Sequence, residues 1–229
     1  MKAVLSILVL AASLPSLAQD TFTLKRVATE GESAKYKLNV DTSFQGMAVN
    51  YTASILEQVV SFGADGTLVT KSTQSNVVLK VDGSEMDTGS DSESDTTTSD
   101  ARGRIVLIEG AMVDDAAYRV ANLTSLVWPE GPVSVGSKWS LDREASEKQG
   151  TPASKSEFEI VALETVKGVE AVKIRYSTKE TAGEMPATAT GFQWVAKATG
   201  KHLRSEADWK NAPVSGQIID AKVVIELVD

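Results

Sequence analysis

The sequence predicts a mainly β protein, with a single curved antiparallel sheet (a half-barrel) of about ten strands and one principal helix. Three observations predict this fold. Apolar and polar residues alternate with a period of two over most of the chain, Ala-x-Gly turns separate the alternating segments, and helical periodicity is confined to one window. The chain has 229 residues, of which 42% are hydrophobic, so it is long enough to bury a sizeable core.

The strand expected at 169–178 illustrates the alternation. Val172, Ile174 and Tyr176 point to one face, and the residues between them are polar. This pattern is typical of an antiparallel strand with one solvated face. A strand that includes Phe158 and Ile160 precedes it, and the others are expected at 34–42, 49–62, 67–81, 96–100, 104–109, 138–143, 190–196, 201–209 and 217–228.

Three turns have the same form, namely Ala64-Asp65-Gly66, Ala101-Arg102-Gly103 and Ala198-Thr199-Gly200. Ala-x-Gly at a hairpin tip favours a type I turn closed by a glycine bulge, so each of these glycines is expected at positive φ. The recurrence is open to two interpretations. It is either ordinary hairpin chemistry or the trace of two pseudo-repeat halves, 22–112 and 133–229.

The helix is expected at 114–127. Asp114 and Asp115 can cap its N-terminus, and Pro129 ends it because the residue before a proline leaves the α region. Apolar residues recur between them at helical spacing, at Ala116, Val120, Leu123 and Val127.

Residues 1–18 have the pattern of a secretory signal peptide. Lys2 precedes an apolar run that ends at Pro15, and Ser16 and Ala18 place small residues before a cleavage site after Ala18. No later segment reaches the length of apolar sequence that spans a membrane. We therefore expect a mature domain at 19–229, β-rich and single, that is periplasmic or secreted.

Composition excludes several classes of function. The chain has no cysteine, so disulfides, thiolate catalysis and iron–sulfur clusters are excluded. A net charge of −8 argues against nucleic acid as a partner. With a single histidine, metal sites of the usual kind lack ligands, and we expect no metal and no cofactor.

No motif predicts an enzyme. His202, the only histidine, would have to serve any Ser-His-Asp triad, and no G-x-S-x-G elbow is present. We expect His202 to be an exposed strand residue and expect no catalytic residue. A carboxylate-dependent hydrolase stays open as an alternative, because two of the 31 acidic residues could converge.

The segment Asp82 to Asp100 is acidic and of low complexity. It contains no basic residue, and such a segment buries too little apolar surface to order itself. It predicts a mobile, solvated hairpin loop rather than a calcium site.

The aromatic residues give the one indication of a ligand. Phe192 and Trp194 share one face of their strand, and Trp209 lies on the strand that follows. They either pack the sheet on the helix or line a cavity for an apolar small molecule or lipid. Under the second interpretation, Phe192, Trp194 and Trp209 are the ligand-lining candidates.

One segment carries a resemblance to known proteins. Pro132-Val133-Ser134-Val135-Gly136-Ser137-Lys138-Trp139-Ser140 resembles the P-V-x-V-G-x-x-W segment of exported bacterial envelope proteins. The layout is similar to that of the lipoprotein-carrier superfamily (LolA, LolB and LppX-like proteins), a half-barrel covered by helices. This chain differs in having one helix and no lipid-acceptor cysteine.

The resemblance implies a non-catalytic envelope protein that carries an apolar ligand or lipid in the hollow of its sheet. The alternative is a structural or interaction protein of the envelope with no ligand. Within the segment, Gly136 permits a turn and Trp139 is expected to be a buried scaffold residue.

Overall fold

The structure is a computed structural model that describes residues 20–87, 92–110, 113 and 115–228. Over these residues the predicted fold class is confirmed, because the chain is mostly strand and forms a large open antiparallel sheet with one α-helix. The elements are β1 (Ser33–Phe44), β2 (Met47–Phe62), β3 (Leu68–Val81), β4 (Ser84–Met86), β5 (Glu93–Ser99), β6 (Ile105–Gly110), α1 (Asp115–Thr124), β7 (Lys138–Arg143), the 3-10 turn η1 (Glu147–Gln149), β8 (Ser154–Val166), β9 (Val169–Glu180), β10 (Thr188–Ala196), β11 (His202–Val214) and β12 (Gln217–Leu227).

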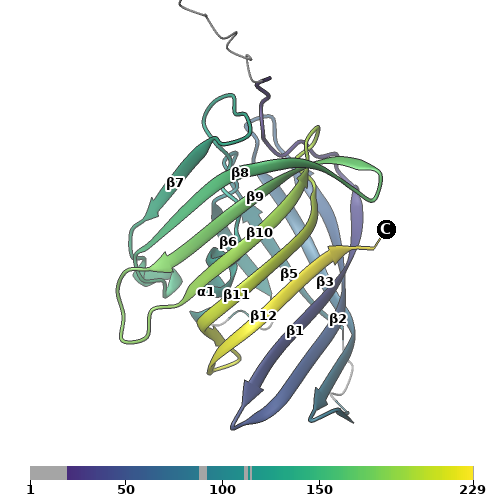
Figure 1. Cartoon of the computed structure of the whole chain (residues 1–229), viewed down its shortest axis with the longest axis vertical. Helices are drawn as coiled ribbons and strands as arrows, with labels where there is room; N and C mark the ends of the chain where they lie inside the picture. Colours follow the sequence, from purple (N-terminus) through teal and green to yellow (C-terminus); the bar gives the residue numbers. More distant parts are fainter. Residues whose placement is uncertain (1–19, 88–91, 111–112, 114, 229) are drawn as a thin grey trace, which may run out of the picture.

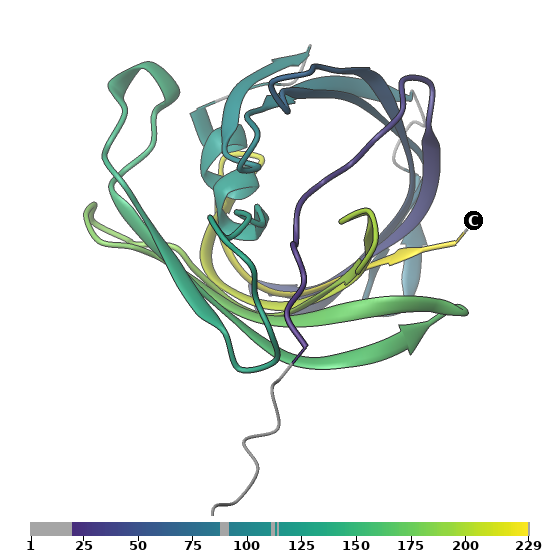
Figure 2. The same ribbon diagram turned by 90° about the horizontal axis from the view of Figure 1, so that it is seen from above.

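The strands follow the order β6-β5-β3-β2-β1-β12-β11-β10-β9-β8-β7, and β4 pairs with β3 beside this path. The edges of the sheet are therefore β6 and β7, which are neighbours in sequence on either side of α1. The sheet curves strongly without closing, and seen from above it wraps around a central space (Figures 1 and 2).

The first and last strands meet in the middle of the sheet. β1 pairs with β12 in antiparallel register, with Val40 opposite Val223 and Leu38 opposite Ile225. All four side chains belong to or pack against the main core. The two halves of the chain thus join along one apolar seam.

Helix α1 lies inside the curve of the sheet and packs on β6, β9, β10 and β11 (Figure 2). It is shorter than expected, because it ends at Thr124 rather than Val127. Leu123 and Val127 are nonetheless buried, at 1% and 0% exposure, so the apolar stripe continues into the extended segment after the helix. Asp114, which was predicted to cap the N-terminus, lies outside the described residues.

The glycines of the three Ala-x-Gly turns have positive φ as predicted, 84° at Gly66, 79° at Gly103 and 65° at Gly200. At Gly103 a Cβ would lie only 2.5 Å from the carbonyl oxygen of Leu126. The β5–β6 turn can therefore approach the segment after α1 only because this residue is glycine.

The prediction for the acidic segment is wrong in part. The strand expected at 96–100 is present, but it begins earlier, inside the acidic segment, as β5 (Glu93–Ser99), which pairs with β3 and β6 on its two sides. The physical reason is the run Thr96–Thr98, since β-branched side chains favour strands and a strand with two partners satisfies its backbone. Residues 88–91 of the segment lie outside the described residues.

Around the P-V-x-V-G-x-x-W segment, Gly136 has φ +88°, which agrees with its expected role in a turn. The side chain of Trp139 is half-buried at the start of β7 rather than fully buried. It is one of the partly buried side chains that pack against the main core.

The predicted signal peptide, residues 1–18, lies outside the described residues. Within the described part of the chain, no helix has the length and apolar character needed to cross a bilayer.

Candidate functional site: a cavity on the concave face

A cavity of about 370 Å³ lies on the concave side of the sheet. At about 30 Å³ per water molecule, this volume corresponds to roughly twelve waters or a small organic molecule. Its walls come from β1, β2, β3, β5, β6, β10, β11 and β12, from the segment after α1, and from the chain before β1.

The cavity is lined by alternate residues of neighbouring strands. Glu57 on β2 lies opposite Ser72 on β3, and Thr70 on β3 lies opposite Thr97 on β5. Directly opposite residues of an antiparallel pair share a face. Because of this pairing register, the inward side chains of neighbouring strands form one continuous row around the curve of the sheet.

The lining mixes two chemistries. One part is apolar and the other consists largely of hydroxyl groups, which can both donate and accept hydrogen bonds. The apolar lining residues are Ile55, Leu68, Ile105, Leu126, Trp128, Val195 and Ile225, and the hydroxyl residues are Tyr36, Thr70, Ser72, Thr97, Ser99, Thr124, Ser125 and Ser205.

The segment 20–32 runs across the upper opening of the curved sheet, and we call it the strap (Figure 2). The amide of Val27 donates to the carbonyl of Thr199 over 2.8 Å, and the amide of Gly31 donates to Val59 over 2.9 Å. Leu24 is 1% exposed and joins the main core. The strap thus attaches to both halves of the sheet.

Strap and sheet approach each other closely at Gly200. A Cβ on Gly200 would lie 2.5 Å from the carbonyl oxygen of Lys25, a distance that real Cβ atoms do not show. Gly200 therefore has two roles, since it adopts the positive φ of the turn and its missing Cβ leaves room for the strap.

Two cations near the cavity are held by one carboxylate of the strap. Arg26 Nη2 lies 3.0 Å from Glu32 Oε1, and Lys201 Nζ lies 3.4 Å from the same oxygen. Although burial alone would raise the pKa of Glu32, Arg26, Thr29 and Lys201 together hold it below its usual range.

Glu57 differs from Glu32 in having no close partner. It lines the cavity from β2, and its carboxylate makes no hydrogen bond or ion pair with any other described residue. Burial raises the pKa of its carboxyl group, and the more distant Arg26 lowers it only in part. Glu57 is an acceptor that faces open space.

His202 is not the exposed strand residue that we expected. It lines the cavity and packs on Tyr36, with ring centroids 5.4 Å apart, and the Tyr36 hydroxyl donates to the His202 carbonyl over 3.2 Å. Burial lowers the pKa of His202 to about 4, so the imidazole is neutral at pH 7. The pairing of β10 with β11 contains a bulge, because Trp194 lies opposite Arg204 but the next residue, Val195, lies opposite His202. This bulge turns the His202 ring inward.

The floor of the cavity includes the C-terminal end of α1. Gln193 Nε2 donates to the carbonyl of Thr124 over 2.6 Å, and Arg143 Nη2 donates to Ser125 Oγ over 2.8 Å. Gln193 thus supplies a partner for one of the last carbonyls of the helix. Burial lowers the pKa of Arg143 to about 10, and the guanidinium nevertheless stays charged at pH 7.

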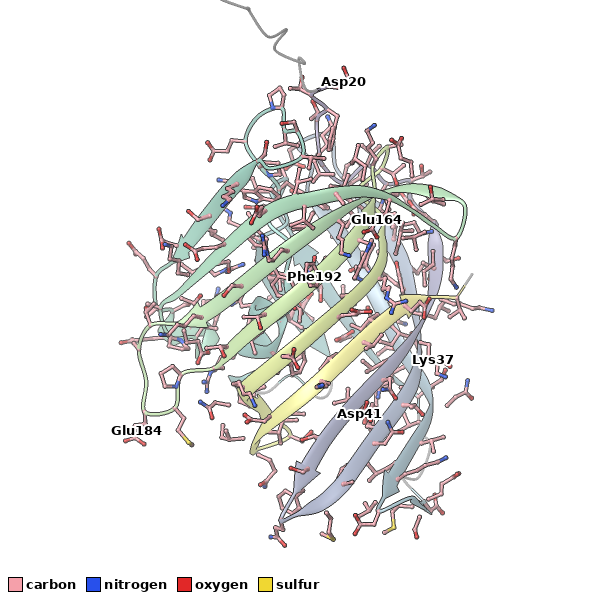
Figure 3. The ribbon with its side chains drawn as sticks, in the orientation of Figure 1. Asp20, Lys37, Asp41, Glu164, Glu184 and Phe192 are labelled. Carbon is pink, nitrogen blue, oxygen red and sulfur yellow. The ribbon has the colours of Figure 1, made fainter. Side chains whose placement is uncertain are left out.

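Phe192 and Trp194 do not line this cavity. Gln193 and Val195, between and after them on β10, face the cavity, so the two aromatic rings lie on the outer face of the sheet. Figure 3 shows Phe192 on that face. There Lys173 Nζ lies 5.0 Å and 4.9 Å from the centroids of the Phe192 and Trp194 rings.

Trp209 lies on the concave side but is not among the residues that line the cavity. It is 8% exposed within the main core. Its indole Nε1 is buried and donates to no described group. The three aromatic candidates are therefore divided between the two faces of the sheet.

Neither a cluster of metal ligands nor a second unpaired carboxylate is found among the described residues of the cavity. Over the described ranges, no three His, Cys, Asp or Glu side chains gather closely enough to hold a metal ion. The second carboxylate of the cavity, Asp100, accepts from the Arg102 and Arg104 amides and pairs with Arg104 Nε over 2.6 Å.

Sequence reasoning missed Glu57, Tyr36 and Arg26. A signal for Glu57 was present, because Ala53, Ile55, Glu57 and Val59 form one alternating row, and Ala53 and Val59 are buried. A carboxylate at an inward position of such a row is unusual, which makes Glu57 a candidate site residue. Arg26 lies in a segment without periodicity, so no comparable signal existed for it.

Comparisons with known proteins give two similar solved structures. One is described as an exported protein with a YMCC-like fold from Bacteroides fragilis, with 12% identity, a TM-score of 0.34, and coverage of 92% of this chain and 100% of that one. The other is a DUF1329 family protein from Desulfovibrio piger, with 11% identity, a TM-score of 0.23, and coverage of 87% and 85%. No protein-family model matches the chain, and a search of curated proteins finds no match.

Proposed function

We propose that this chain is an exported, non-catalytic binding protein that holds a small amphipathic molecule in the cavity on the concave face of its sheet. The cavity carries the proposal, because it combines an apolar wall with polar groups that lack protein partners. Export is proposed from the signal-peptide pattern of residues 1–18.

A long-chain lipid is less well supported than a small ligand. The volume of about 370 Å³ is small for two acyl chains, and hydroxyl groups line much of the wall. A hydrolase has less support still, because Asp100 is held by backbone amides and Arg104, which leaves Glu57 without a second free carboxylate beside it.

The first experiment is native mass spectrometry of protein purified from its own host. We expect a co-purifying molecule of low mass that denaturation releases. A purely structural protein of the envelope would give only the mass of the chain.

A pair of variants on β3 tests whether the cavity is the binding site. Thr70→Phe fills the cavity, whereas Lys71→Phe places the same side chain on the exposed outer face one residue away. We expect Thr70→Phe to abolish the co-purifying mass and Lys71→Phe to retain it, with circular dichroism showing that both fold. Retention in both variants would contradict the proposed site.

A further inference from the structure

We propose that the ligand presents a hydrogen-bond-donating head group, an ammonium or a hydroxyl, to Glu57, and that the site rejects anionic head groups. This inference rests on the proposed function and adds to it the chemical class of the ligand.

The two cations near this end of the cavity, Arg26 and Lys201, already have partners within the protein. Arg26 and Lys201 both bind the same oxygen of Glu32, and Arg26 also donates to the carbonyl of Val27. Lys201 Nζ has a second acceptor in the carbonyl of Ser33, at 3.5 Å. A carboxylate or phosphate on the ligand would have to compete with Glu32 for these two cations.

Glu57, the charged lining residue without a close partner at this end of the cavity, accepts hydrogen bonds, whereas the wall hydroxyls, such as that of Ser72 opposite it, both donate and accept. An ionised carboxylate only accepts, and Glu57 has no donor among the described residues. The neutral ring of His202 offers one acceptor nitrogen. A ligand that donates satisfies these groups, whereas an anion would place like charges together in a poorly solvated space.

The remaining wall fits an apolar body. Ile55 is two residues from Glu57 on the same face of β2, and Ile225, Val195 and Leu68 complete an apolar surface around the cavity. The expected ligand therefore has a donor head at Glu57 and a short hydrocarbon body directed away from it.

Three probes with the same eight-carbon chain test the head group, namely octylamine, octanol and octanoate, titrated calorimetrically at pH 8. We expect octylamine and octanol to bind and octanoate to bind at least about tenfold more weakly than octylamine. The comparison of octylamine with octanol shows whether the donor is cationic or neutral. Octanoate binding as tightly as octylamine would overturn the inference.

Glu57→Gln tests the role of the carboxylate with little change of shape. We expect this variant to bind octylamine at least about tenfold more weakly than the wild type and to lose its discrimination against octanoate. Glu109→Gln removes an exposed carboxylate from β6 and serves as the matched control, with unchanged affinities. An unchanged preference in Glu57→Gln would show that another group selects the head.

The two proposals fail in different ways. If the chain is not a binding protein, none of the probes binds, or all bind the Thr70→Phe variant as well as the wild type. If only the ligand class is wrong, probes bind in a manner that Thr70→Phe blocks, but without the expected order of head groups.

Discussion

The indole ring of Trp139 stacks on the ring of Phe158, with centroids 5.3 Å apart and 17° between the planes. Its Nε1 also donates a 2.6 Å hydrogen bond to the carbonyl of Val127. Trp139 therefore joins the edge strand β7 to β8 and to the segment that follows α1.

Replacing Trp139 should destabilise the protein without a specific effect on binding. Trp139→Ala removes the stacking and the hydrogen bond, and we expect a loss of about 3 kcal/mol in the free energy of unfolding, at the low end for large aromatics because the ring is half-buried. Trp139→Phe keeps the stacking and should lose about 1 kcal/mol. Urea denaturation measures both, and an unchanged stability in Trp139→Ala would contradict the scaffold role.

The ion pair between Arg119 on α1 and Glu180 on β9 anchors the helix to the sheet. Two contacts of 2.7 Å join the guanidinium to the carboxylate, whose side chain is 5% exposed, and the Ala187 amide also donates to it. Arg119→Met leaves this carboxylate buried without its cation, so we expect a loss of about 3 kcal/mol.

A control for this ion pair is the exposed pair Lys210–Asp220, whose atoms lie 2.8 Å apart with side chains 62% and 55% exposed. Lys210→Met should change stability by less than about 1 kcal/mol. Equal losses in Lys210→Met and Arg119→Met would show that burial of the Arg119 pair contributes nothing.

Stability should depend on pH through His202. Its pKa is about 4 in the folded protein and 6.5 in the unfolded chain, so between these values the unfolded chain binds more protons. The free energy of unfolding is therefore lost as the pH falls from about 6.5 to about 4, by no more than about 3 kcal/mol.

Comparison with His202→Gln isolates this contribution, because other groups titrate in the same range. The raised pKa of Glu57, for example, acts in the opposite direction and is present in both proteins. We expect a flatter pH profile of urea stability in His202→Gln. If the pH profiles of the two proteins are parallel, the pKa of His202 is the same in the folded and the unfolded chain.

The close approach at Gly200 predicts a sensitive position. Gly200→Ala adds a Cβ that clashes with the carbonyl of Lys25, and the residue keeps a φ of +65°. We expect a loss of roughly 2–3 kcal/mol and faster tryptic cleavage of the strap at Lys25 and Arg26.

Gly216→Ala is the matched control for Gly200→Ala. Gly216 has φ +73°, and an added Cβ meets nothing within 4 Å. It should lose only about 1 kcal/mol from backbone strain. The difference between the two variants measures the contact between strap and turn, and equal losses would show that this contact is absent.

The local pattern of the sequence was sufficient for the fold class and for most strands. Period-two alternation and Ala-x-Gly turns depend on neighbouring residues, and these signals placed the glycines of the turns at positive φ as observed. The strand expected at 96–100 was found, but its start was placed too late, because the acidic composition of 93–95 favoured a loop whereas β5 is stabilised there by partners distant in sequence.

The site could not be predicted in the same way. Alternation shows that Phe192 and Trp194 share a face, but which face is concave depends on the curvature of the whole sheet. The inward position of His202 depends on a bulge between two strands, which is a property of the pairing. Only the inward position of Glu57 within an apolar row could have been read from one strand.

The seam between β1 and β12 has a consequence for how the chain folds. Its partners, such as Val40 and Val223, are separated by nearly the whole sequence, and they occupy the middle of the sheet rather than an edge. Such distant contacts make loop closure costly before any pairing is gained, so folding is expected to be slow, on a scale of milliseconds to seconds. Until the last strand is available, β1 and β11 each present an unpaired edge, and this intermediate is the species most prone to associate with another chain.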